Sequence, residues 1–267
     1  LAGNSELILA ASHQAAGQGA DLVLTPELSL WGYPPRDLLL RPSLIAKQGA
    51  VLNQLAASLA QELPQLAVLV GMAEPSGAAP LPNLFNAVAL VEAGSWRVVA
   101  RKRLLPTYDV FDEQRYFCAA TGPSVLELER GGRTWRLGLT ICEDLWVEEE
   151  LQGHRLAGAD PVAELLSSRI DLLLNLSALG GELAIGHVLY STTGSNEWEN
   201  SQPVHRSAGS GGNRRELALD LRAGEHAHGG TRALVLALLV DGLLDQEVPV
   251  RERRDLRQVR HDHYLMV

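Results

Sequence analysis

The sequence predicts an α/β protein in which helices pack on mixed β-sheets. Short apolar runs that suit buried strands alternate with stretches of helical periodicity, and pairs of β-like segments joined by glycine turns lie among them. A purely parallel sheet would not contain such hairpins, so a mixed arrangement is expected. The 267 residues, 46% of them hydrophobic, suffice for one large core or two modest ones.

The first part of the chain predicts a helix, a strand, a second helix and a second strand. Residues 5–17 have apolar side chains at helical spacing, and the apolar run 22–25 ends at a proline. This run suits a buried strand whose end delivers Glu27 into a loop. Residues 43–63 again show a helical stripe, and residues 66–70 suit the next strand.

The middle of the chain predicts two hairpins, a helix and a further strand. Glycines at 94 and at 131–132 suit the turns of the hairpins, and residues 161–168 suit the helix. The segments expected as strands are 83–91, 97–101, 125–129, 134–141 and 170–176.

The composition changes from about residue 180. Residues 192–232 are dense in Gly, Ser, Asn, His and charged residues without a period of 2 or 3.6, which indicates loop or poorly ordered chain. Residues 233–244 form an apolar block that could dock, although no pattern says where. Residues 251–263 are dense in Arg and Asp, which is typical of a solvated helix face or tail.

Charge and cysteine usage exclude several classes of protein. A net charge of −9 gives no general attraction for nucleic acid or anionic lipid, so a small-molecule ligand is expected. The longest apolar run is far shorter than the roughly 20 residues of a membrane helix, and no signal peptide is recognised. Two cysteines far apart in sequence, Cys118 and Cys142, suit a reducing compartment, so a cytoplasmic location is expected.

Cys142 is the candidate nucleophile. It ends an apolar strand and is followed at once by acidic residues, so a thiol there can be both held and exposed. The alternative is that it is a buried small hydrophobic residue, as free cysteines commonly are. Cys118 has apolar neighbours and no acid or base beside it, so it is interpreted as structural.

A cysteine nucleophile needs a base and a group that stabilises the oxyanion. None of the eight histidines is convincingly placed for this. Glu27 and Lys102 each follow a β-like run, as Cys142 does, and three such ends on one face of a sheet would form a site. A lysine beside the thiol is expected to lower its pKa, although nearby carboxylates act in the opposite direction.

Three strings carry a resemblance to a known family. They are Thr25-Pro-Glu-Leu-Ser-Leu-Trp-Gly-Tyr-Pro-Pro-Arg-Asp-Leu-Leu, Arg101-Lys-Arg-Leu-Leu-Pro-Thr-Tyr-Asp-Val-Phe-Asp-Glu-Gln-Arg-Tyr-Phe and Ile141-Cys-Glu-Asp-Leu-Trp. The order Glu, Lys, Cys resembles the carbon-nitrogen hydrolase (nitrilase) superfamily. The longer strings resemble, more narrowly, the glutaminase domain of bacterial glutamine-dependent NAD+ synthetases, and the resemblance runs to about residue 178.

The resemblance implies a four-layer αββα sandwich and hydrolysis of glutamine through a cysteine thioester. Glu27 would be the general base, Cys142 the nucleophile and Lys102 the group that stabilises the tetrahedral intermediate. Tyr108 would line the glutamine pocket, and Glu113 would be a second acidic residue near the lysine. The glutaminase step implies no metal and no cofactor, whereas ATP and Mg²⁺ belong to a synthetase domain that receives the ammonia and amidates deamido-NAD. Family members are also expected to form homo-oligomers.

Two departures from the family pattern set the expected domain boundaries. The chain begins past the strand that opens family members, so a truncated N-terminus is expected. After Asn175-Leu-Ser-Ala the family pattern stops, with Leu179-Gly-Gly in place of the expected continuation. Residues 1–178 are therefore expected to be the hydrolase domain, and residues 179–267 a divergent, partly disordered segment without a synthetase domain. A frame slip or recombination in the coding DNA would produce such a break.

Two rival interpretations remain open. The first is an amidase or nitrilase that acts on another small amide. The second is a catalytically silent chain, truncated or frame-shifted, that serves only for interaction. The presence of Glu27, Lys102 and Cys142 favours activity, and the altered segment after Ala178 favours silence.

Overall fold

The computed structural model describes residues 1–77, 82–107, 112–145 and 160–179, together with four later strands at 183–191, 201–203, 217–220 and 235–238. The α-helices are α1 (Ala2–Gly17), α2 (Pro42–Glu62) and α4 (Pro161–Ser167). Short 3₁₀ turns are η1 (Arg36–Leu40), η2 (Glu113–Arg115) and η3 (Cys142–Leu145). None of the helices in this part of the chain is long and apolar enough to span a membrane.

The strands form two sheets. The first is six-stranded in the order β10-β11-β1-β2-β3-β4, and the second is five-stranded in the order β5-β6-β7-β8-β9. The strands of the first sheet are β1 (Leu22–Leu24), β2 (Ala67–Pro75), β3 (Leu84–Glu92), β4 (Ser95–Arg101), β10 (Leu217–Asp220) and β11 (Val235–Leu238). Those of the second are β5 (Ser124–Arg130), β6 (Arg133–Ile141), β7 (Leu172–Leu179), β8 (Leu183–Ser191) and β9 (Ser201–Pro203).

Both sheets mix parallel and antiparallel pairs, as the sequence predicts. β1 runs parallel to β2, and β6 runs parallel to β7. The hairpins β3–β4 and β5–β6 are antiparallel. Their turns contain Gly94, Gly131 and Gly132 at positive φ, a region that glycine enters without steric cost.

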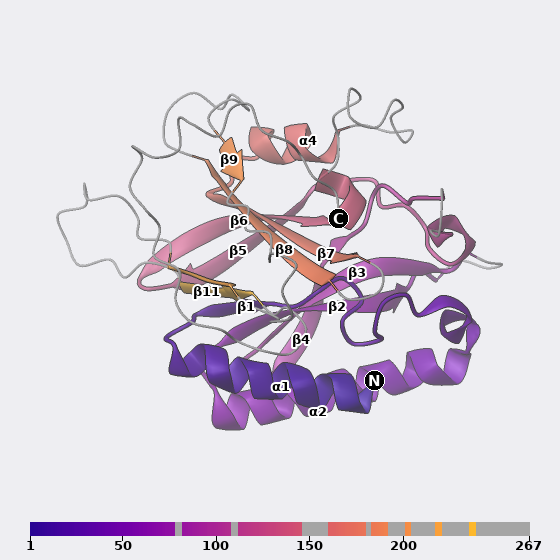
Figure 1. Ribbon diagram of the computed structural model, residues 1–267, viewed down its shortest axis with the longest axis horizontal. Helices are drawn as coiled ribbons and strands as arrows, with labels where there is room; N and C mark the ends of the chain where they lie inside the picture. Colours follow the sequence, from indigo (N-terminus) through magenta and orange to yellow (C-terminus); the bar gives the residue numbers. More distant parts are fainter. Residues whose placement is uncertain are drawn as a thin grey trace.

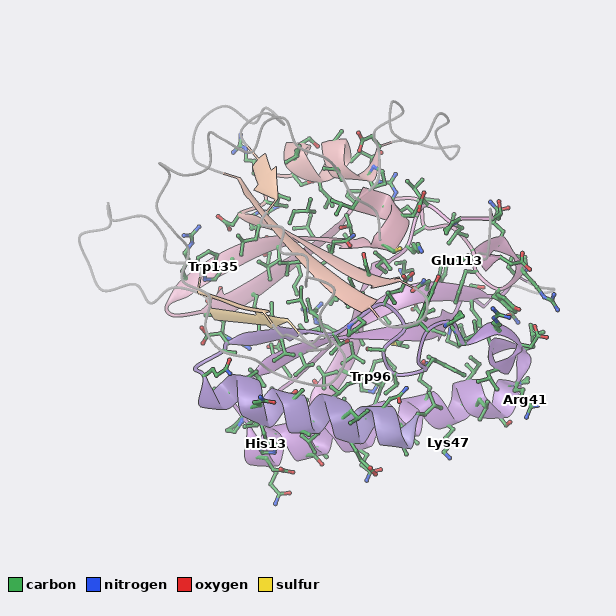
Figure 2. All side chains as sticks on the ribbon, viewed as in Figure 1. His13, Arg41, Lys47, Trp96, Glu113 and Trp135 are labelled. Carbon is green, nitrogen blue, oxygen red and sulfur yellow. The ribbon has the colours of Figure 1, made fainter. Side chains whose placement is uncertain are left out.

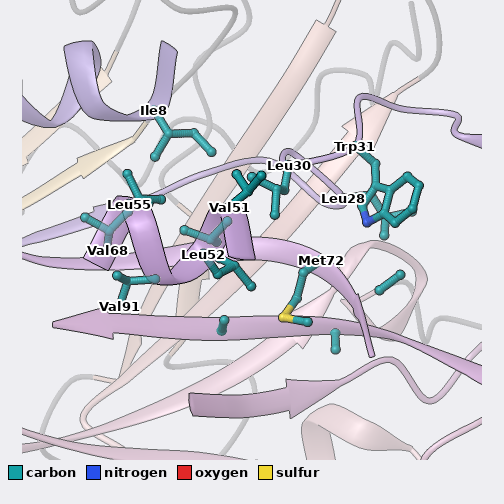
Figure 3. Packing of buried hydrophobic residues seen from close by; sticks show 14 of the residues in the cluster. Ile8, Leu28, Leu30, Trp31, Val51, Leu52, Leu55, Val68, Met72 and Val91 are labelled. Carbon is teal, nitrogen blue, oxygen red and sulfur yellow. The ribbon is translucent and has the colours of Figure 1, made fainter. Parts of the chain in front are cut away.

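Three hydrophobic clusters fill the spaces between the layers. One joins α1 and α2 to the first sheet, a second fills the space between the two sheets, and a third joins α4 to the second sheet. The described elements therefore stack as helices, sheet, sheet and helix, with α1 and α2 at one side of the molecule and α4 at the other (Figure 1). Figure 3 shows the first cluster, in which Leu28 and Leu30 of the loop after β1 pack toward Leu52 of α2 and Met72 of β2.

Helix ends differ slightly from the sequence expectation. α1 begins at Ala2 rather than near residue 5, and the Ser5 N–H already donates to the Leu1 carbonyl (3.0 Å). The Asn4 side chain donates to the Leu30 carbonyl (3.1 Å) instead of capping the helix. At α4 the N-cap is Asp160, whose carboxylate accepts hydrogen bonds from the main-chain N–H groups of Val162 and Ala163.

The C-terminal segment contributes strands to both sheets. Within residues 192–232, for which the sequence shows no strand pattern, the structure describes β9 and β10. The apolar block from residue 233 supplies β11, which pairs parallel with β1. The sequence could not place this block, because pairing with β1 is a contact between distant parts of the chain. The Arg-rich and Asp-rich run 251–263 lies outside the described residues.

Candidate active site

Glu27 lies in the loop that joins β1 to η1. Its side chain is completely buried. The loop packs directly on β2 at Gly71, where a Cβ atom would lie 2.4 Å from both the Pro26 carbonyl oxygen and the Leu28 nitrogen. Because real Cβ atoms do not approach so closely, only glycine at this position lets the loop carry Glu27 inward.

The same loop is tied to β2 by hydroxyl groups. Thr25 Oγ1 donates to the Leu69 carbonyl (2.9 Å) and accepts from the Gly71 N–H (3.2 Å). Ser29 Oγ is 2.6 Å from Thr25 Oγ1 and also accepts from the Gly71 N–H. The two hydroxyl groups satisfy the Gly71 N–H, and the Leu69 carbonyl also accepts the main-chain N–H of Thr25 (3.0 Å).

Lys102 follows β4 directly, and its side chain is fully buried. Its main-chain N–H donates to the Asn86 carbonyl of β3 (2.8 Å). The Nζ atom donates to Oε1 of Glu27 (2.8 Å) and to Oε1 of Glu113 (2.8 Å). Burial lowers the pKa of the ammonium, but the charges of Glu113 and Glu27 outweigh it and raise the pKa well above its ordinary value. Lys102 is therefore charged at neutral pH.

Glu113 completes the environment of this ammonium. It opens η2, which lies near the start of β3, where Phe117 pairs with Leu84, and away from the helical surface that carries His13 and Lys47 (Figure 2). Burial raises the pKa of the Glu113 carboxyl to about 7, while Lys102 acts in the opposite direction and Glu27 adds to the rise. The Lys102 ammonium thus lies between one carboxylate and a second that titrates near neutral pH.

Cys142 stands where β6 ends and η3 begins, with φ of +47°, an uncommon conformation for a residue with a side chain. The thiol is buried, and the charges of Glu27, Lys102 and Glu113 all act on it. Burial raises the pKa of the thiol well above its ordinary value, Glu27 adds to the rise, and Lys102 opposes it. The expected lowering of this pKa is therefore wrong: the thiol is dehydrated, and two carboxyl groups flank the ammonium.

Asp144 and Asn175 hold the Cys142 turn. Both oxygens of the buried Asp144 carboxylate accept main-chain N–H groups, Oδ1 those of Arg103 (3.0 Å) and Leu104 (2.8 Å) and Oδ2 that of Ile141 (3.2 Å). One carboxylate thus joins the peptide groups next to Lys102 and next to Cys142. From β7, the Asn175 amide donates to the Cys142 carbonyl (3.3 Å).

The structure brings Lys102 into direct contact with Glu27 and Glu113 and places Cys142 within their electrostatic reach. Tyr108, the remaining residue that the sequence nominates, lies outside the described residues. No group of three or more potential metal ligands is arranged to hold an ion within the part of the chain that the structure describes.

Two residues of the site went unnoticed in the sequence, and Asp144 was noticed only as an acidic residue beside Cys142. The two are Asn86 and the half-buried Tyr33, whose pKa is raised by burial and by the charges of Glu27 and Glu113. A signal existed for Asn86, because an amide in the middle of an apolar strand demands a polar partner. No such signal existed for Asp144, which in the sequence is one of two adjacent acids.

Comparison with known proteins gives a consistent result. The sequence profile of the carbon-nitrogen hydrolases matches residues 1–211. A glutamine-dependent NAD(+) synthetase of Synechocystis sp. is 41% identical over 181 residues, which are 67% of this chain and 31% of that protein. The enzyme of the same name from Thermotoga maritima is 36% identical over 179 residues, 66% of this chain and 27% of that protein.

A solved structure agrees with these matches. The glutamine-dependent NAD+ synthetase from Acinetobacter baumannii, in complex with ADP, superimposes with a TM-score of 0.52 and 30% sequence identity, covering 68% of this chain and 30% of that one. The chain thus spans less than a third of the length of each of these three relatives.

Proposed function

Because the chain belongs to the carbon-nitrogen hydrolase family, we propose that it hydrolyses the side-chain amide of glutamine through a thioester on Cys142. The ammonia released would serve the synthesis of NAD+ from deamido-NAD, as the names of the relatives suggest. The proposal rests on one observation: a buried Lys102 ammonium contacts both Glu27 and Glu113, and Cys142 lies within reach of their charges.

Glu27 is the proposed base. Its Oε1 accepts two hydrogen bonds, from Lys102 and from Asn86, whereas its Oε2 is buried and has no hydrogen-bond partner among the described residues. A thiol with a raised pKa is protonated at rest and must lose its proton as it attacks. The Oε2 oxygen is the group free to take that proton.

Lys102 is the proposed stabiliser of the oxyanion. An ammonium carries three N–H donors, and Glu27 and Glu113 take two of them. The third can donate to the oxygen of the substrate carbonyl as negative charge develops on it. In a buried site this interaction is stronger than in water. The two carboxyl groups keep the lysine charged and hold its Nζ in place.

The reaction balances with these groups and water. Cys142 Sγ bonds to the amide carbon while its proton passes to Glu27, and the carbonyl electron pair moves to the oxygen. The tetrahedral intermediate collapses, the carbon–nitrogen bond breaks, and Glu27 returns the proton to the leaving nitrogen, which departs as ammonia. Water then attacks the thioester and gives its proton to Glu27. The carbon–sulfur bond breaks to release glutamate, and the proton returns to the thiol.

The test is ammonia release from a panel of amides by the wild-type chain and by Cys142→Ala. Release from glutamine that exceeds release from asparagine and propionamide, and that disappears in Cys142→Ala, is the expected result. Faster ammonia release from a simple aliphatic amide would show that the substrate is another small amide and not glutamine. A correctly folded wild-type chain that releases no ammonia from any of them would contradict the proposal and identify the chain as catalytically silent.

A further inference from the structure

Asn86 connects two members of the site, and the steps above give it no bond to the substrate and no proton to transfer. It lies on β3 and is completely buried. Its main-chain carbonyl accepts the N–H of Lys102 (2.8 Å), and its side-chain Nδ2 donates to Oε1 of Glu27 (2.7 Å). One residue of β3 therefore contacts the proposed base with its side chain and the proposed oxyanion stabiliser with its main chain.

We propose that Asn86 is a positioning residue that determines which oxygen of Glu27 acts as the base. This inference rests on the proposed amide hydrolysis. The side-chain amide fixes the rotation of the Glu27 carboxylate, so that Oε1 stays with Lys102 and Asn86 while Oε2 stays free for the thiol proton.

The two oxygens differ because hydrogen bonds lower the proton affinity of the atom that accepts them. Oε1 accepts from an ammonium and an amide, and Oε2 accepts from none of the described residues. Without Asn86, one ammonium donor alone would hold the carboxylate, which could rotate and exchange its oxygens. Each oxygen would then be the hydrogen-bonded one for part of the time, so that no single oxygen would stay free to take the thiol proton.

The unpaired oxygen of the same amide supports this role. Asn86 Oδ1 is buried and has no hydrogen-bond partner among the described residues. An unpaired buried carbonyl destabilises a fold, so the orientation that serves Glu27 offsets any stability that the amide contributes. The positioning role therefore predicts that removal of the amide reduces activity far more than stability.

The experiment compares the wild-type chain with Asn86→Ala, Asn86→Asp and the matched control Asn53→Ala. Asn53 also uses its side chain, which accepts a hydrogen bond from the Trp96 indole (2.7 Å), but it lies on α2 away from the site. Glutamine hydrolysis is measured as kcat and KM, together with the thermal midpoint. Asn86→Ala is expected to lower kcat by about tenfold to a hundredfold while KM changes less than about twofold.

The split between kcat and KM separates positioning from a general loss of structure. A general loss would lower the thermal midpoint and raise KM, whereas a misplaced base lowers kcat with little change in KM. Asn86→Asp has the same size and replaces the donor by an acceptor, so it should lower kcat at least as much. It carries the test if the alanine variant does not fold. Asn53→Ala should match wild type.

Wild-type kcat in both Asn86 variants would overturn the inference. If the wild-type chain hydrolyses no amide, the proposed function fails, and alkylation by iodoacetamide still decides the inference. Because a positioned base assists loss of the thiol proton, Asn86→Ala should slow alkylation of Cys142 severalfold and leave that of Cys118 unchanged. Equal rates at Cys142 in both proteins would overturn it.

Discussion

The ammonium of Lys102 donates to Oε1 of Glu27 across 2.8 Å, and neither side chain is exposed to solvent. Charges buried in this way are tolerated only as a set, because each depends on its partner for the solvation that water would otherwise supply. Removal of Lys102 would leave the buried carboxyl groups of Glu27 and Glu113 without a counter-charge. The ion pair therefore matters for stability as well as for the proposed chemistry.

Lys102→Met should destabilise the chain by about 3 to 5 kcal/mol, because it leaves buried carboxyl groups without a counter-charge. Lys47→Met, the same substitution at an exposed position of α2, should change the free energy of unfolding by less than about 0.5 kcal/mol. Urea denaturation measures both. Adding Glu113→Gln to Lys102→Met should restore part of the loss, and a double variant less stable than Lys102→Met would argue against charge burial as the cause.

Gly71→Ala should displace the Glu27 loop, since the new methyl group would lie 2.4 Å from main-chain atoms of Pro26 and Leu28. We expect a loss of about 1 to 3 kcal/mol in stability and of about tenfold or more in kcat. Gly49→Ala is the control, because its Cβ meets nothing within 4 Å and it lies inside α2. That variant should gain up to about 1 kcal/mol from helix propensity. An active, stable Gly71→Ala would contradict the close approach.

Stability should depend on pH through Asp144. Burial raises the pKa of this carboxyl from 3.8 to about 6, against hydrogen bonds from Leu104 and its neighbours. The folded chain therefore binds the proton more tightly than the unfolded chain, and this group adds stability as pH falls from about 6 to 4. The difference in unfolding free energy between wild type and Asp144→Asn should grow by on the order of 1 to 3 kcal/mol over that range. A constant difference would contradict the burial effect.

Gln48 should contribute strongly to the stability of the packing between α2 and the first sheet. Its buried side chain accepts from the Trp31 indole and the Ala73 N–H and donates to the Ala73 carbonyl, which joins α2, β2 and the end of the Glu27 loop. Gln48→Leu leaves these groups unpaired and should cost about 3 kcal/mol. Gln54→Leu, the same change at an exposed site of α2, should be nearly neutral. Thermal unfolding compares the two, and equal midpoints would refute the role of this network.

Much of the framework follows from local patterns. The helices, the glycine-turn hairpins and the strand ends before Glu27, Lys102 and Cys142 are visible in the sequence, because periodicity and turn residues act over a few positions. Only three-dimensional contact could show that Asn86 meets Glu27, 59 positions away. Similarly, Asp144 reaches main-chain groups 40 and 41 positions away.

The pKa of Cys142 illustrates why the pKa values of the site residues are harder to predict from the sequence than which residues form the site. The sequence supplies a lysine and several acids but not their burial, and burial is the largest cause of the raised pKa of the thiol. The same limit applies to β11, whose parallel pairing with β1 depends on a contact between opposite ends of the chain.

The central claim is that Cys142 forms a thioester with its amide substrate. Acid-quenched incubation with glutamine, followed by mass spectrometry of the intact chain and of its peptides, tests it most directly. The account predicts a glutamyl adduct on the peptide containing Cys142, absent from Cys142→Ala and hydrolysed on further incubation in the wild type. Ammonia release with no adduct at Cys142 under rapid quench, or an adduct confined to Cys118, would contradict it.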